Sequence, residues 1–262
     1  MDTYDLKESF ESIDYYIDTI LKEEIKHPYG QSKKAGRRIW GLLTFYHSRA
    51  NLKYLLDADI DGFFEDLSRE ALTYRTFLKA YHNQIPVPES NVDSSYYPPF
   101  LCAIATANFE LCRELDGLMP QQFGQHDQEE PFAVTMMFRK LAVQDEKACK
   151  TALAYFKQHC DGVDQFTPLI QATAGLVQKD EDLYNAGLID YLNCFNKLSD
   201  DEIEELEPGE AHLSLEGLAC IQLACQRGLK TKVTHPMIPE PLQQAKVIIP
   251  QDGYPPWPEP EG

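Results

Sequence analysis

Apolar residues recur every three or four positions along nearly the whole chain, and this spacing limits the fold more than any other feature. The most regular stripe consists of Phe64, Leu67, Ala71, Tyr74, Leu78 and Tyr81. A helix places residues with this spacing on one face, whereas a half-buried strand needs strict alternation of polar and apolar residues. No stretch of comparable length alternates in this way. The sequence therefore predicts an all-α protein.

Capping residues mark where several of these helices begin and end. Thr167, Asp145, Asp180 and Ser214 stand where an N-cap is expected, since their side-chain oxygens can accept a hydrogen bond from the first helical turn. Gly228 is predicted to close the last helix in a left-handed conformation, with the next residue, a leucine, as its apolar contact.

Three prolines, Pro99, Pro131 and Pro168, each precede or begin an apolar run. This position is typical of proline at the first residue of a helix. With the caps, these prolines predict stacked antiparallel helical hairpins in an irregular α-solenoid-like array. We expect one domain over residues 1–242, followed by an extended proline-rich tail over residues 243–262. The predicted helix pairs lie near residues 5–56, 62–115, 131–160 and 168–198, and the last helix covers residues 214–228.

The charge of the chain limits its partners. Of its 262 residues, 24 are Lys or Arg and 42 are Asp or Glu, so the formal net charge is −18. We therefore expect no direct nucleic-acid or membrane partner. No apolar run reaches the roughly 18 residues that a membrane span needs, and the first residues do not resemble a signal peptide. The seven cysteines are odd in number and lack CxxC spacing, so we expect free thiols in a cytoplasmic protein.

Catalytic and cofactor motifs are absent from the sequence. It contains neither a phosphate-binding GxxxxGK[ST] loop nor an HExxH zinc motif. The histidines are scattered, and none has an obvious cysteine or serine partner. We therefore expect no catalytic residues and no cofactor, and predict that the protein is not an enzyme.

One local motif could bind calcium. Asp57, Asp59, Asp61 and Gly62 match the first, third, fifth and sixth positions of an EF-hand loop. Position 12, where a bidentate glutamate belongs, is Ser68. The alternative is a tight turn in which one of these aspartates caps the following helix. The sequence favours the capping turn and leaves calcium as a weaker candidate.

An acidic segment without a single Lys or Arg precedes the last helix. It could meet a basic partner and accelerate association, or it could be a solvated loop that keeps the protein soluble. Its acidic residues are Asp200, Asp201, Glu202, Glu204, Glu205, Glu207 and Glu210.

The C-terminal helix and the segment after it resemble the end of the immunity protein 49 family. The resemblance rests on HLSLEGLA at residues 212–219, LA at 223–224, RGL at 227–229 and PMIPEPL at 236–242. It is closer over residues 212–242 and looser over residues 37–242. Proteins of this family are encoded beside bacterial polymorphic toxins and act by binding, so the resemblance brings no catalytic residues.

The resemblance implies an immunity protein that binds and neutralises a cognate toxin acting in the cytosol by blocking its active site. The acidic charge suits a basic toxin domain that targets nucleic acid or a nucleotide. The acidic segment is then the predicted toxin-binding surface. The alternative is a helical-repeat adaptor that binds an endogenous basic partner on stacked helices. The sequence does not predict the oligomeric state.

Overall fold

The computed structural model is built from α-helices and short connections, and it confirms the predicted all-α class. The structure describes residues 3–26, 33–84, 92, 94–124, 127–198, 203, 206 and 208–251, and no strand occurs among them. None of the helices in this part of the chain combines the length and apolarity that a bilayer-crossing helix requires. The helices are α1 (Thr3–Lys26), α2 (Lys33–Asp57), α3 (Ile60–His82), α4 (Pro98–Ala105), α5 (Phe109–Leu118), α6 (Glu129–Ala142), α7 (Glu146–Cys160), α8 (Phe166–Gln178), α9 (Glu181–Cys194), the 3-10 turn η2 (Phe195–Lys197), α11 (Leu215–Gln226) and α12 (Glu240–Gln243).

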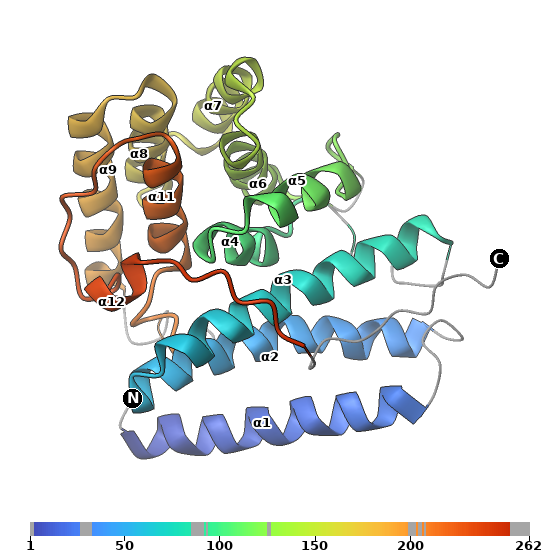
Figure 1. Cartoon of the computed structure of the whole chain (residues 1–262). Coiled ribbons are helices and arrows are strands. Elements are labelled where there is room, and N and C mark those ends of the chain that lie inside the picture. The colour runs from blue at the N-terminus through green and yellow to red at the C-terminus, as the bar shows by residue number, and fades with distance from the viewer. Residues whose placement is uncertain are drawn as a thin grey trace.

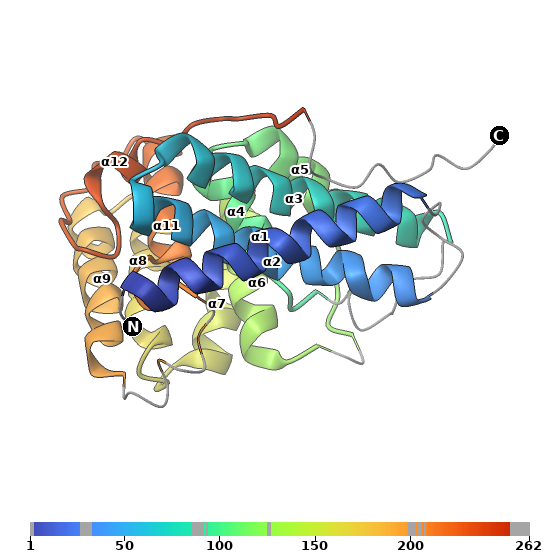
Figure 2. The same ribbon diagram turned by 90° about the horizontal axis from the view of Figure 1, so that it is seen from below.

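Helix α3 packs against α2 on one side and against α4 and α5 on the other. The three long helices α1, α2 and α3 lie side by side in Figure 1, and Figure 2 shows α1 on the outside of this layer. The helices α4 and α5 pack on α3, and the predicted hairpins α6–α7 and α8–α9 follow (Figure 1). The last long helix, α11, does not extend this row but packs back against α4, α8 and α9. After α12 the chain has no helix up to residue 251, as predicted for this part of the tail.

The predicted caps at Asp145, Asp180 and Ser214 are confirmed. The Asp145 carboxylate accepts a hydrogen bond from the amide of Ala148 at 2.9 Å, and the other two caps accept bonds of the same kind at 3.0 Å. At the other end of α11, Gly228 has a φ of 76°. The amides of Gly228 and Leu229 donate to carbonyls of the last helical turn at 3.1 and 2.9 Å, which is the predicted glycine stop.

The predictions for Thr167 and two of the prolines are wrong in position. Helix α8 begins at Phe166, and Thr167 therefore lies within its first turn. The turn that precedes the helix is closed by a hydrogen bond from the Phe166 amide to the Val163 carbonyl. Pro168 in α8 and Pro131 in α6 stand at the third helical residue. This position also suits proline, since the first four amides of a helix have no intrahelical partner. Helix α4 begins one residue before Pro99, at another proline.

Helix α3 is buried over most of its length, including its charged residues. Sixteen of its 23 residues are buried, and Asp66 is fully so. The Asp66 carboxylate lies 2.8 Å from the Arg49 Nε, 2.9 Å from the Lys53 Nζ and 2.7 Å from the Arg69 Nη1. Arg49 also pairs with Asp14 on α1 at 2.7 Å. This network therefore joins α1, α2 and α3.

Three cations keep the Asp66 carboxylate ionised. Burial alone would raise the pKa of Asp66, but the hydrogen bonds and charge of Arg49, with the charge of Lys53, hold it below its ordinary value. A carboxylate with a depressed pKa in the folded state stabilises the fold fully above its unfolded pKa of about 3.9, and that contribution is lost as the pH falls further.

We expect Asp66→Asn to lower the free energy of unfolding by about 3–5 kcal/mol at pH 7, because buried cations lose their partner. The difference from the parent protein should shrink as the pH falls below about 4 toward the lower folded-state pKa of Asp66, because the unfolded chain then binds a proton at Asp66 before the folded protein does. Urea unfolding at several pH values measures both effects. Glu114→Gln is the matched control, because Glu114 also pairs with two cations but is 35% exposed, and it should cost less than about 1 kcal/mol. Equal stability of Asp66→Asn and the parent would contradict this account.

Two glycines allow α8 and α9 to touch through their backbones. A Cβ atom at Gly187 would lie 2.2 Å from the Ala172 amide nitrogen, and one at Gly175 would lie 2.3 Å from the Tyr184 amide nitrogen. Both obstacles are backbone atoms, which cannot turn aside as a side chain could. The close contact of this hairpin therefore depends on both glycines.

We expect Gly187→Ala to separate α8 from α9 and to destabilise the protein by about 1–3 kcal/mol, as overpacking does in other cores. Gly117→Ala is the control, because Gly117 is helical and exposed and an added Cβ would meet nothing within 4 Å. It should stabilise the protein by about 0.4–1 kcal/mol by restricting the unfolded chain. Thermal melts of the two variants would refute the account if they shifted in the same direction.

Candidate functional site

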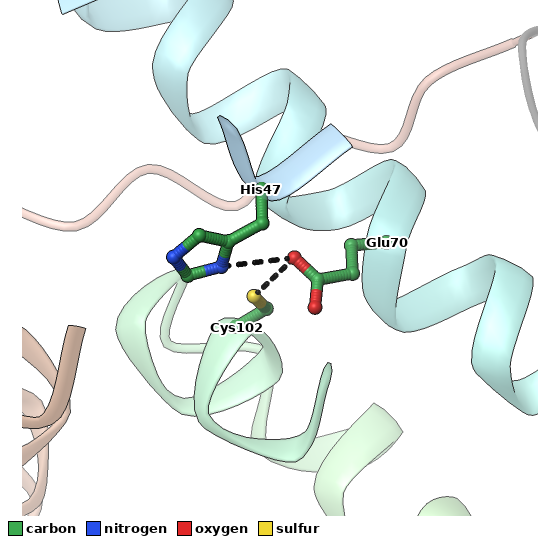
Figure 3. Close-up of side chains that lie close together, drawn as sticks. All are labelled: His47, Glu70 and Cys102. Carbon is green, nitrogen blue, oxygen red and sulfur yellow. Dashed lines mark hydrogen bonds and ion pairs between the residues drawn. The ribbon is translucent and has the colours of Figure 1, made fainter. Parts of the chain in front are cut away.

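Three potential ligand side chains meet in the interior at the junction of α2, α3 and α4. Figure 3 shows His47 from α2, Glu70 from α3 and Cys102 from α4 pointing toward one another. The His47 Nδ1 lies 3.3 Å from the Glu70 Oε2, and the Cys102 Sγ lies 3.0 Å from the same oxygen. All three residues are buried. We call these residues the His–Glu–Cys cluster.

The apolar stripes of the helices bring these side chains together. His47 follows Leu43 by four residues and precedes Ala50 by three, so it faces the core with them. Glu70 stands in the same way between Leu67 and Tyr74. The side chains of the cluster are therefore held by helices that pack for other reasons.

Glu70 determines the protonation of its neighbours. Burial opposes the charged imidazolium, but the charge and hydrogen bond of Glu70, with the charges of Glu210 and Glu216, raise the pKa of His47 to about 9. Burial and the nearby Glu70 carboxylate raise the pKa of the Cys102 thiol well above its usual range. In the absence of another ligand, a protonated imidazole and a neutral thiol therefore both donate to Glu70.

One oxygen of Glu70 lacks a partner. Glu70 is fully buried, and its Oε1 has no hydrogen-bond partner within the described residues. Asp66, one helical turn earlier, differs because it faces three cationic side chains. A buried carboxylate oxygen without a partner is costly and is unusual in native proteins.

A cavity of about 210 Å³ adjoins the cluster through His47. The second ring nitrogen of His47, Nε2, lies 3.5 Å from the Glu210 Oε1. Most of the cavity wall comes from the C-terminal half of the chain. Its lining residues are His47, Tyr97, Pro98, Val134, Gln165, Phe166, Leu169, Tyr191, Phe195, Leu206, Glu210, Leu213, Leu215 and Glu216.

Two tyrosines line the cavity together with its second acid, Glu216. These are Tyr97 and Tyr191. Burial and the charge of Glu216 raise the pKa of both hydroxyls, so both remain protonated donors. The cavity thus combines two carboxylates with aromatic and aliphatic side chains. Such a wall favours a cationic group with an apolar stem.

Only Glu210 among the predicted toxin-binding acids can be placed. It lies at the cavity with its side chain 34% exposed, and it contacts His47. Leu206 of the same segment also lines the cavity. The other six acids, which lie outside the described residues, are Asp200, Asp201, Glu202, Glu204, Glu205 and Glu207.

The calcium candidates instead take part in local structure. Asp59 is the N-cap of α3 and accepts a hydrogen bond from the Gly62 amide at 2.9 Å, as the capping-turn interpretation predicts. Asp61 pairs with Lys246 of the tail segment. Asp57 is exposed at the end of α2. These contacts explain the motif as a helix start that also anchors the tail.

The prediction of free thiols is confirmed, and the structure places a cysteine near one of the histidines. All seven cysteines are free, and five of them are buried. His47, however, has a cysteine neighbour in space, although sequence spacing showed none. Glu70 is 23 residues from His47 and 32 from Cys102, so no local motif could reveal the cluster. The sequence signal that could have indicated a buried site was a charged residue, Glu70, at a position of the apolar stripe.

Comparison with known proteins gives a family match. The family model described as immunity protein 49 matches residues 158–242. The resemblance predicted from the C-terminal helix is thereby confirmed, and its looser part before residue 158 lies outside the match. The match covers 85 of the 262 residues and shows a likeness within that segment. No curated protein and no solved structure matches the chain significantly.

Proposed function

We propose that this protein is a cytoplasmic immunity protein that binds a cognate toxin and neutralises it by blocking its active site. The observation that carries the proposal is the immunity protein 49 match over residues 158–242. Ten of the fourteen residues that line the cavity lie within that matched segment. Within the proposal, the cavity and the acidic segment before α11 form one toxin-binding surface.

The charges support a basic toxin. The chain has a net charge of −18, and Glu210 and Glu216 both face the cavity. The surface would attract a positively charged domain over a long range and fix its orientation. The cavity would then receive one basic side chain, whose stem would pack on the aromatic wall. A toxin domain that acts on nucleic acid or a nucleotide has such a positive surface. The protein acts in this proposal by binding, without catalysis.

We expect the protein to rescue a sensitive cell that expresses the C-terminal domain of the toxin encoded beside its gene. Because inhibition is by direct binding, the two proteins should co-purify as a complex. Cell survival and size-exclusion chromatography measure the two effects. Toxicity that persists in the presence of the folded protein would contradict the proposal and favour a helical-repeat adaptor.

We expect triple reversal of Glu204, Glu205 and Glu207 to lysine to slow association with the toxin by about tenfold or more at low salt. The salt dependence of the association rate should flatten, because long-range attraction is lost. Stopped-flow or surface-plasmon measurements give the rates.

The matched control changes the net charge equally at exposed acids elsewhere. Asp18 on α1, Glu110 on α5 and Asp182 on α9 are exposed, and none of them lines the cavity. Their reversal to lysine should leave most of the association rate intact. Equal slowing by both triple variants would assign the effect to net charge and remove the acidic segment from the interface.

A further inference from the structure

We propose that the His–Glu–Cys cluster is a binding site for a thiophilic divalent cation, best matched by Zn²⁺. Within the part of the chain that the structure describes, it is the one group of three or more His, Cys, Asp and Glu side chains whose ligand atoms all lie within 4.8 Å of one another. Imidazole nitrogen, thiolate sulfur and carboxylate oxygen are the three ligand types that Zn²⁺ takes from proteins. The inference does not depend on the toxin.

The distances between the ligand atoms of the cluster are close to the ligand–ligand distances of a tetrahedral zinc site. Zinc–ligand bonds of about 2.0–2.3 Å place a nitrogen and an oxygen ligand about 3.4 Å apart, and a sulfur and an oxygen ligand about 3.6 Å apart. The His47 Nδ1 and the Glu70 Oε2 are separated by 3.3 Å. The Cys102 Sγ and the Glu70 Oε2 are separated by 3.0 Å and must move apart by about 0.6 Å. A small rotation of the thiol side chain provides this movement.

Two further observations point to a missing ligand. The buried Oε1 of Glu70 has no partner and lies on the carboxylate that bridges the cluster. A cation would supply that partner, with Glu70 bound through one or both oxygens. In addition, the Nε2 of His47 lies 3.5 Å from the Glu210 Oε1. Metal-bound histidines commonly donate their second N–H to a carboxylate in this way, which fixes the ring for coordination.

The three ligands match the charge of a divalent cation. A neutral imidazole, a carboxylate, a thiolate and M²⁺ sum to zero. The thiol proton and any proton on Nδ1 are released to solvent as the cation binds. A bound site without net charge costs less to bury than a charged one.

The cavity reaches the cluster at His47. His47 belongs both to the cluster and to the cavity wall, whereas Glu70 and Cys102 do not line the cavity. The ion would enter past the His47 ring, and a water molecule would complete four-coordination. The bound ion would join α2, α3 and α4, and its binding energy would add to the stability of the folded state.

We expect metal-free, reduced protein to bind one Co²⁺ per chain when the metal ion alone is titrated. Co²⁺ is the probe because its thiolate complexes absorb in the near ultraviolet and its tetrahedral sites absorb strongly in the visible. Zn²⁺ should displace Co²⁺ and raise the melting temperature. Cys102→Ser should abolish the thiolate band. Glu210→Gln should weaken binding by about 10- to 100-fold, as expected for a residue that only orients a ligand.

Cys112→Ser is the matched control, because Cys112 is also a fully buried helical cysteine, and it should leave the spectrum unchanged. His47→Gln assigns the site independently if Cys102→Ser does not fold, as judged by circular dichroism. Folded wild-type protein that shows no stoichiometric Co²⁺ spectrum would overturn the proposal. It would also be overturned if the spectrum survived in folded Cys102→Ser or His47→Gln, because surface thiols such as Cys225 would then be the ligands.

Discussion

The structure depends on the burial of α3, which carries two acids into the interior one helical turn apart. Asp66 and Glu70 are both fully buried, and a buried carboxylate is tolerated only with partners. Asp66 forms an ion pair with Arg49 of α2, and Arg49 forms a second ion pair with Asp14 of α1. Glu70 contacts His47 of α2 and accepts a hydrogen bond from Cys102 of α4. The helices around α3 are therefore positioned by its charges as well as by its apolar face.

Much of the helical framework could be predicted from the sequence, because it is encoded locally. Apolar spacing gave the helices, and Asp145, Asp180, Ser214 and Gly228 marked ends that the structure confirms. Positions within one turn were less certain from sequence. A proline is accepted at any of the first helical residues, so proline alone could not fix where α6 and α8 begin.

The candidate site could not be predicted, because it is made by contacts between helices. Periodicity shows which face of a helix is buried but not which helix covers that face. The same limit applied to α3, whose stripe predicted one apolar face although most of its circumference is buried. A helix that is buried on most sides has no polar face, so its charged residues look in the sequence like solvent-exposed ones. The one sequence sign that Glu70 is buried is its position within the apolar stripe.

His47 links the interior to the proposed toxin-binding surface. Its two ring nitrogens face different carboxylates, Glu70 within the core and Glu210 at the cavity. A proton or a cation at Nδ1 leaves Nε2–H directed at Glu210 in either case, so the cavity wall keeps its shape whichever occupies the cluster. Loss of both would free the ring to donate from only one nitrogen. One of the two carboxylates would then lose its contact with His47. The contact between the core and the segment that carries Glu210 thus depends on what neutralises Glu70.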